Sequence, residues 1–279
     1  MSVTREQRAL YERQSEDRGD MEQHYRWFAP RLRLDETVRF AADRAAERVL
    51  EVGCGDGVLL AAVLDALPAP PRRATGVDLA RGRLARARAR LDARGGGAAG
   101  SSVLCGTADA LPLRGSSFDL VICAEVLEHV PAPAASILEL ARVLAPGGRL
   151  LLSVPVVGWS RWIEARLTGR VRFLDEEEHL REYSAVPLPR CETLAALRNR
   201  IEGAGHVITL ERGVYAFPHR GERMWHALLA RGPLHAPAVA LDRALGASAA
   251  RRWGRWVVMI AEKPAWTSAR SPGVAAGRS

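Results

Sequence analysis

The stretch VLEVGCGDG at residues 49–57 constrains the fold of this chain more than any other. Its first four residues, three apolar and one acidic, predict a buried strand. Three glycines at every second position then predict a tight turn, and the apolar run at 58–64 predicts a helix. A strand, a glycine turn and a helix place bare backbone N–H groups where a ligand can lie against them. The spacing is G-x-G-x-G and not the G-x-G-x-x-G of the dinucleotide fingerprint, so other residues must decide the ligand.

Predicted strands and helices alternate along most of the chain, with proline- and glycine-rich stretches between them. This alternation is typical of a doubly wound, parallel sheet. We therefore predict an α/β fold with a Rossmann-like, doubly wound sheet of seven strands, mostly parallel with an antiparallel last strand, plus helical cover segments. The predicted strands are 48–52, 74–78, 102–105, 118–123, 149–154, 206–217 and 255–262, the last two paired as a hairpin. The predicted helices are 35–47, capped by Asp35, and 58–66, 80–93, 109–111, 133–144, 158–168 and 190–203.

The pattern divides the chain into four regions. Residues 1–30 are predicted to form an N-terminal helical cap, and residues 31–155 form the ligand-binding core. Residues 156–262 complete the sheet and carry two inserts, 156–185 and 219–250, that are expected to cover a substrate. The Ala/Ser/Gly/Arg-rich residues 264–279 are predicted to be a disordered tail.

The composition excludes several classes of protein. The net charge of +8 comes almost entirely from arginine, since Lys263 is the only lysine. Because the arginines are scattered, including those along 81–94, we interpret them as solvated side chains and as a bias of the coding sequence. Four cysteines without CxxC spacing predict reduced thiols. With no signal peptide and no run of 18 apolar residues, the chain is expected to be cytoplasmic, without a transmembrane segment. Its oligomeric state cannot be predicted.

Acidic residues follow the glycine turn at the ends of three successive strands. Asp78 ends the second strand, Asp109 follows the third, and Glu125 follows the fourth. In an open α/β sheet, ligands bind beyond the carboxyl ends of the strands. A carboxylate at the place of Asp78 can accept both hydroxyls of a ribose. Together these strand ends therefore predict a ligand-binding edge rather than a set of solvent-facing loops.

These motifs resemble the class I S-adenosylmethionine-dependent methyltransferases. The resemblance covers about residues 30–155 and, more weakly, 175–262. It rests on LEVGCGDG at 50–57, GVDLA at 76–80, GTADALPL at 106–113, FDLVICAEVLEHV at 118–130 and LARVLAPGGRLLLSVP at 140–155. It implies S-adenosylmethionine as cofactor. The cofactor is cationic at sulfur and has no pyrophosphate, so a site with acids and few cations agrees with it.

The resemblance also implies a role for individual residues toward this cofactor. Glu51, Gly53, Cys54 and Gly55 would face its methionine and sugar parts. Asp78 would hold the ribose hydroxyls and Leu79 would pack on the adenine. Asp109 would bind the adenine amino group, Ala110 would offer a backbone N–H, and Ala124 would lie near the methionine chain. In addition, the segment RLRL at 31–34 resembles the O-methyltransferases of ubiquinone synthesis, in which an arginine at the position of Arg33 touches the cofactor carboxylate.

Three residues are candidates for the general base: Glu125, His129 and His179. Glu125, Glu128 and His129 also match an E-x-x-E-H motif that binds a divalent cation in some relatives. Many small-molecule methyltransferases share these letters without a metal. A divalent metal is therefore possible but not expected, and the alternative is that Glu128 and His129 only form local hydrogen bonds.

The function predicted from these residues is methyl transfer to a small molecule. We expect O-methylation of an aromatic, quinone-like or lipid-like natural product, because the cover segments are apolar and contain tryptophans. The alternatives are C-methylation of a similar acceptor and methylation of RNA. Nucleic acid is the less expected partner because basic and aromatic residues are not interleaved. A cofactor-binding protein that has lost activity is a third possibility.

Overall fold

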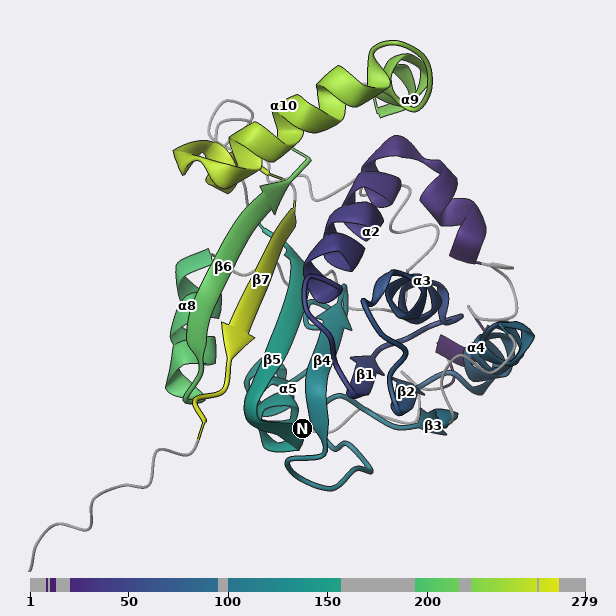
Figure 1. The fold of residues 1–279 in the computed structure, drawn as a ribbon, viewed down its shortest axis with the longest axis vertical. Helices are drawn as coiled ribbons and strands as arrows, with labels where there is room; N and C mark the ends of the chain where they lie inside the picture. Colours follow the sequence, from purple (N-terminus) through teal and green to yellow (C-terminus); the bar gives the residue numbers. More distant parts are fainter. Residues whose placement is uncertain are drawn as a thin grey trace, which may run out of the picture.

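A computed structural model of the chain describes residues 9, 11–13, 21–94, 100–156, 194–215, 222–254 and 256–265. Its centre is one sheet of seven strands in the order β3-β2-β1-β4-β5-β7-β6 (Figure 1). Strands β1 to β5 pair in parallel, and β7 pairs antiparallel with both β5 and β6. The predicted fold class is confirmed. The strands are β1 (Arg48–Val52), β2 (Arg73–Asp78), β3 (Ser101–Cys105), β4 (Phe118–Ala124), β5 (Leu144–Pro155), β6 (Val207–Val214) and β7 (Trp256–Glu262).

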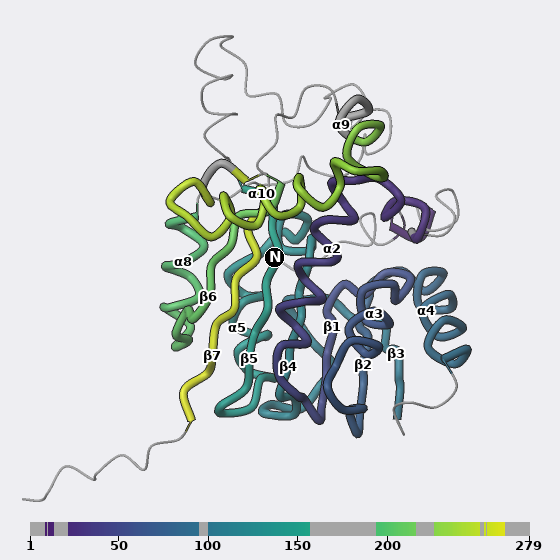
Figure 2. Tube along the Cα trace, turned by 45° about the horizontal axis from the view of Figure 1, so that its top comes forward, coloured from purple at the N-terminus to yellow at the C-terminus, as the bar shows by residue number. Residues whose placement is uncertain are grey.

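Helices cover both faces of the sheet, as the alternation of buried residues along the strands requires. On β4, Leu120 and Ile122 pack into a core with α2 and α3, whereas Val121 and Cys123 pack into a second core with α5 and α8. Figure 2 shows α10 lying over the ends of β6 and β7. The helical elements are η1 (Met21–Arg26), α2 (Phe28–Ala41), α3 (Val58–Ala66), α4 (Arg81–Ala93), α5 (Pro133–Val143), α8 (Leu194–Gly203), α9 (Glu222–Leu229), α10 (His235–Ala247) and η2 (Ala249–Trp253).

Two predicted helices are wrong. The helix expected at 35–47 is α2, which begins at Phe28 and ends at Ala41. It begins earlier because its buried apolar face extends back to Phe28, so Asp35 lies inside the helix and pairs with Arg31 at 2.9 Å instead of capping. Residues 109–111 are not helical but belong to a turn closed by a bridge between Thr107 and Ala110.

Two strand boundaries also differ from the predictions by three residues or more. Strand β5 begins at Leu144 rather than at 149, although Gly147 has a φ of 75°. Strand β6 ends at Val214, where Tyr215 takes a φ of 61°. Strands β6 and β7 pair as predicted but are separated in sequence by α9 and α10. The helix at 158–168, most of the first cover segment and residues 266–279 lie outside the described residues.

The described part of the chain contains three cysteines, and all are free thiols. Cys54 and Cys123 are buried and Cys105 is half-buried. Within the same part, every helix is too short or too polar to span a bilayer.

The single lysine joins the end of the sheet to α5. The Lys263 ammonium donates to the carbonyl oxygens of Ala141 at 2.8 Å and Leu144 at 2.7 Å. These carbonyls belong to the last turn of α5 and the residue that follows it, where a cation also favours the helix dipole.

We expect Lys263→Met to lower the free energy of unfolding by about 1–2 kcal/mol, because two carbonyl groups lose a charged donor. Urea unfolding measures the change, and Lys263→Arg should recover part of it. An unchanged midpoint in Lys263→Met would show that solvent replaces the ammonium without loss.

Candidate active site

The glycine turn after β1 depends on glycine at each of its three positions. Gly53, Gly55 and Gly57 have φ angles of 76°, 50° and 74°, in the region that side chains disfavour. The N–H of Gly53 donates to the carbonyl oxygen of Val77 at 2.7 Å, which ties the turn to β2. A Cβ on Gly53 would lie 2.1 Å from Val126 Cγ2. At this turn, backbone without side chains therefore lies close to the ends of β1, β2 and β4.

Glu51 lies in β1, directly before this turn, and is buried. Its carboxylate accepts the backbone N–H of Leu60 in the first turn of α3, where the N-cap residue, Gly57, has no side chain to do so. The other oxygen, Oε2, is buried and has no hydrogen-bond partner among the described residues. Burial raises the pKa of Glu51 well above its ordinary value, and the nearby Asp78 adds to the shift. A buried, unsatisfied acceptor is costly unless a ligand completes it.

The Asp78 carboxylate closes the turn from the side of β2. Its two oxygens accept the backbone N–H groups of Gly55 and Ala80, each at 2.9 Å. Burial raises the pKa of Asp78, while these hydrogen bonds and the cation of Arg83 act to lower it.

Arg83 was not predicted as a site residue. One of its guanidinium nitrogens lies 3.5 Å from the place that a Cβ on Gly55 would occupy. Its Nε is buried without a hydrogen-bond partner in the described part of the chain. The arginines of α4 are therefore more than the solvated face that the sequence suggested. Others form ion pairs: Arg86 with Asp56 at 3.2 Å, Arg90 with Glu22 at 3.1 Å, and Arg94 with Asp65.

The loop after β3 places a third acid at the same edge. Asp109 Oδ1 is buried and has no hydrogen-bond partner among the described residues. The backbone N–H of Ala110 donates to Thr107 at 3.2 Å and so closes the turn. Leu79 and Ala124 are half-buried at the ends of β2 and β4.

Glu125 is the most connected acid of the site. Its backbone takes a φ of 57°, and its N–H donates to the carbonyl of Ser153 at 2.8 Å. Its side chain pairs with Arg33 of α2, accepts Trp256 Nε1 at 2.8 Å and accepts Ser153 Oγ at 3.2 Å. The Arg33 guanidinium also lies 5.0 Å from the centre of the Trp256 ring, a cation–π contact. These contacts join α2, β5 and β7 to the end of β4.

Tyr25 is a second residue that the sequence analysis missed. Its hydroxyl is hydrogen-bonded to Arg33, and burial raises its pKa although the Arg33 cation acts in the opposite direction. Tyr25 also lies within the electrostatic reach of Glu51 and Glu125. The sequence offered no signal, since Tyr25 precedes the core region that carries the motifs.

Glu128 and His129 lie after β4, beside this network. Glu128 is buried, and burial together with the neighbouring Glu125 raises its pKa well above the ordinary value. Its Oε2 has no hydrogen-bond partner within the described residues, and its Oε1 lies 4.0 Å from His129 Nε2. No cluster of three or more His, Cys, Asp or Glu side chains among the described residues is placed to hold a metal. His179 lies outside the described residues.

A family of proteins described as "Methyltransferase domain" matches residues 50–152. The chain is 36% identical over 125 residues to the ubiquinone biosynthesis O-methyltransferase of Aromatoleum aromaticum, covering 44% of this chain and 49% of that protein. It is 32% identical over 171 residues to the protein of the same name from Idiomarina loihiensis, covering 56% and 68%. The chain thus spans about half the length of the first relative and two thirds of the second.

The fold also resembles solved structures. One is the complex between the Haloferax volcanii Trm112 methyltransferase activator and a methyltransferase, with a TM-score of 0.61 and 18% identity. The match covers 93% of this chain and 98% of that chain. At this identity the likeness shows the fold alone.

We expect Arg83→Met to weaken ligand binding at the Asp78 edge more strongly as the pH falls. An ionised Asp78 accepts hydroxyl donors, and its raised pKa means that acid protonates it early. Without Arg83 the pKa of Asp78 rises further, so affinity for the ligand is lost at a higher pH. Below that pKa, the affinity at a given pH falls about tenfold for each unit by which the pKa rises. Titration with S-adenosylhomocysteine across pH measures this, with the exposed Arg88→Met as the matched control. Parallel pH curves for wild type and Arg83→Met would contradict the role of Arg83.

Proposed function

The chain belongs to the class I S-adenosylmethionine-dependent methyltransferases, and we propose that it transfers a methyl group to a small-molecule acceptor. One observation carries the proposal. The glycine turn stands at the carboxyl edge of the sheet among acids that keep unsatisfied oxygens: Glu51 Oε2, Asp109 Oδ1 and Glu128 Oε2. These acceptors fit a ligand that brings a cation, hydroxyls and an amino group, and S-adenosylmethionine has all three.

Each acid then has a separate part in binding. Asp78 and the backbone of Gly55 would hold the ribose, and Asp109 would accept the adenine amino group. Glu51 and Glu128 would face the cationic end, while Arg33 supplies the positive charge for a carboxylate. When bound, S-adenosylmethionine supplies a methyl carbon on a cationic sulfur that leaves as a neutral thioether. The protein therefore has to align the acceptor and exclude water.

We propose that Glu125 positions Arg33 and is not the general base. Its carboxylate already accepts from Trp256 and Ser153 and neutralises the buried Arg33. A base must be free to take a proton from the acceptor hydroxyl. In O-methylation the hydroxyl oxygen forms a bond to the methyl carbon as the carbon–sulfur bond breaks. The proton then goes to another group, for which His129 and His179 remain the candidates.

If Glu125 acts through Arg33, Trp256→Phe should reproduce part of the Glu125→Gln defect. Both substitutions weaken the contact between Arg33 and Glu125, so both should weaken cofactor binding. The loss of affinity should be about tenfold in Glu125→Gln and smaller in Trp256→Phe. In both variants, the pH profile of kcat should keep the limb that reports ionisation of the general base. Trp27→Phe is the matched control, since Trp27 is 40% exposed. A Glu125→Gln variant with unchanged cofactor affinity and no turnover would instead make Glu125 the base.

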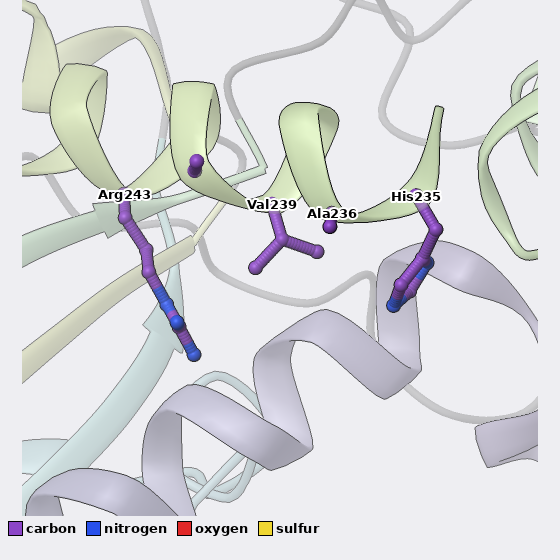
Figure 3. Close-up of a pocket in the computed structure, with 5 residues that line it drawn as sticks. His235, Ala236, Val239 and Arg243 are labelled. Atoms are coloured by element: carbon purple, nitrogen blue, oxygen red, sulfur yellow. The ribbon is translucent and has the colours of Figure 1, made fainter. Parts of the chain in front are cut away.

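For the acceptor we propose an aromatic, quinone-like or lipid-like molecule. Two relatives carry the name ubiquinone biosynthesis O-methyltransferase. A hollow of about 500 Å³ also lies along α10, where Ala236, Val239 and Ala240 give an apolar middle between His235 and Arg243. Figure 3 shows His235, Val239 and Arg243 projecting from α10 toward the side on which α2 runs. A hollow with an apolar middle and polar ends suits an amphipathic acceptor.

Methyl transfer from radiolabelled S-adenosylmethionine to catechols, quinols and lipids tests the function. We expect transfer to at least one of these acceptors, and a loss of about tenfold or more in cofactor affinity in Asp78→Ala. Turnover should survive a chelator, because both carboxylate oxygens of Glu125 already accept hydrogen bonds from Ser153 and Trp256. The proposal is wrong if S-adenosylmethionine does not bind. Binding without transfer, or transfer to RNA that falls steeply with salt, would favour an inactive binding protein or an RNA methyltransferase.

A further inference from the structure

Large apolar side chains are exposed together at one end of the molecule. Among the described residues, six large hydrophobic side chains are exposed, and four of them lie on or beside α9 and α10. We call these four the apolar patch: Trp27, Leu228, Leu234 and Leu241, with exposed fractions of 40%, 47%, 53% and 52%. Figure 1 shows α9 and α10 as an outer layer at one end of the fold. Single exposed leucines are common, but a gathering of this kind indicates an interaction surface.

The exposed residues of α10 are almost all apolar. The single polar one is Arg243, which points toward α2 (Figure 3). A surface helix of a water-soluble protein normally turns charged residues outward. Apart from Arg243, the exposed residues are Ala236, Pro237, Ala240, Leu241, Ala244 and Ala247.

The patch is held in place by specific contacts. The backbone N–H of Phe28 donates to His226 Nδ1 at 3.2 Å, and the Trp27 ring lies 4.7 Å from the His226 ring. On the inner side of α10, the buried Asp242 accepts the backbone N–H of Tyr215 at 3.1 Å. The leucines are therefore presented by helices that are fastened to the core.

The segment that carries most of the patch is basic. Within residues 226–251, the single acid is Asp242, which is buried. Arg243 and Arg251 pair with acids of neighbouring elements, but each of those acids serves two arginines, so a net positive charge remains. Glu36 is shared by Arg39 and Arg243, and Glu211 by Arg198 and Arg251. Arg231, between α9 and α10, is exposed.

We infer that the apolar patch docks on the surface of an anionic phospholipid bilayer. Leucine and tryptophan side chains together with arginines are the composition of helices that lie in the lipid–water interface. A second copy of the chain would bring the same positive charge against the first. A lipid surface supplies both the apolar interior and the negative charge. The hollow along α10 lies beside this patch, so docking would bring it close to the lipids.

Sedimentation with vesicles tests the inference without any assay of activity. Wild-type protein should bind vesicles of phosphatidylcholine and phosphatidylglycerol, and bind vesicles of phosphatidylcholine alone far less. The triple variant Leu228→Asp, Leu234→Asp, Leu241→Asp should lose about tenfold or more of the binding. The matched control is Leu138→Asp on α5, where the leucine is 59% exposed away from the patch. Arg231→Ala should weaken binding by roughly fivefold at low salt.

Three results would overturn the inference. The first is wild-type protein that does not bind anionic vesicles. The second is Leu138→Asp losing as much binding as the triple variant. The third is a dimer in solution that the triple variant dissociates, with no binding to vesicles, which would assign the patch to a second copy. Circular dichroism and the melting temperature check that each variant is folded.

Discussion

The carboxylate of Glu125 is the contact on which the arrangement of the site depends. It neutralises Arg33, which is buried in α2, and it accepts a hydrogen bond from Trp256 at the start of the last strand. Removing one partner of such a pair leaves an uncompensated buried charge. The left-handed backbone of Glu125 is the strain that this geometry requires, and the hydrogen bond of its N–H to Ser153 holds it there. The last strand, β7, must therefore be in place before this end of the site has its shape.

The other acids of the edge explain why a cationic ligand suits the site. Glu51 and Glu128 are buried, and burial raises the pKa of both. The charge of the nearby cation, Arg33, is already balanced by Glu125. A ligand with a sulfonium and an ammonium group would supply the missing positive charge, whereas a pyrophosphate would add negative charge to it. The charge at this edge of the sheet thus agrees with the G-x-G-x-G spacing of the turn.

Much of the fold follows from local patterns in the sequence. The alternation of strands and helices predicts the sheet. The turn at 53–57 could be predicted because its positive φ angles require glycine, and the three glycines stand out in the sequence. The network at Glu125 could not be predicted, because Trp256 lies 131 residues away and a positive φ at glutamate has no sequence signal. Tyr25 and Arg83 were missed for a related reason. Each belongs to a segment whose local pattern is ordinary and meets the site only through tertiary packing.

The most direct measurement is a crystal structure of the protein with S-adenosylhomocysteine. The account predicts the ribose hydroxyls on Asp78, the adenine amino group on Asp109 and the homocysteine end between Glu51 and Arg33. It also predicts that Glu125 still holds Trp256. A ligand bound elsewhere, or at this edge without contact to Asp78, would contradict the account.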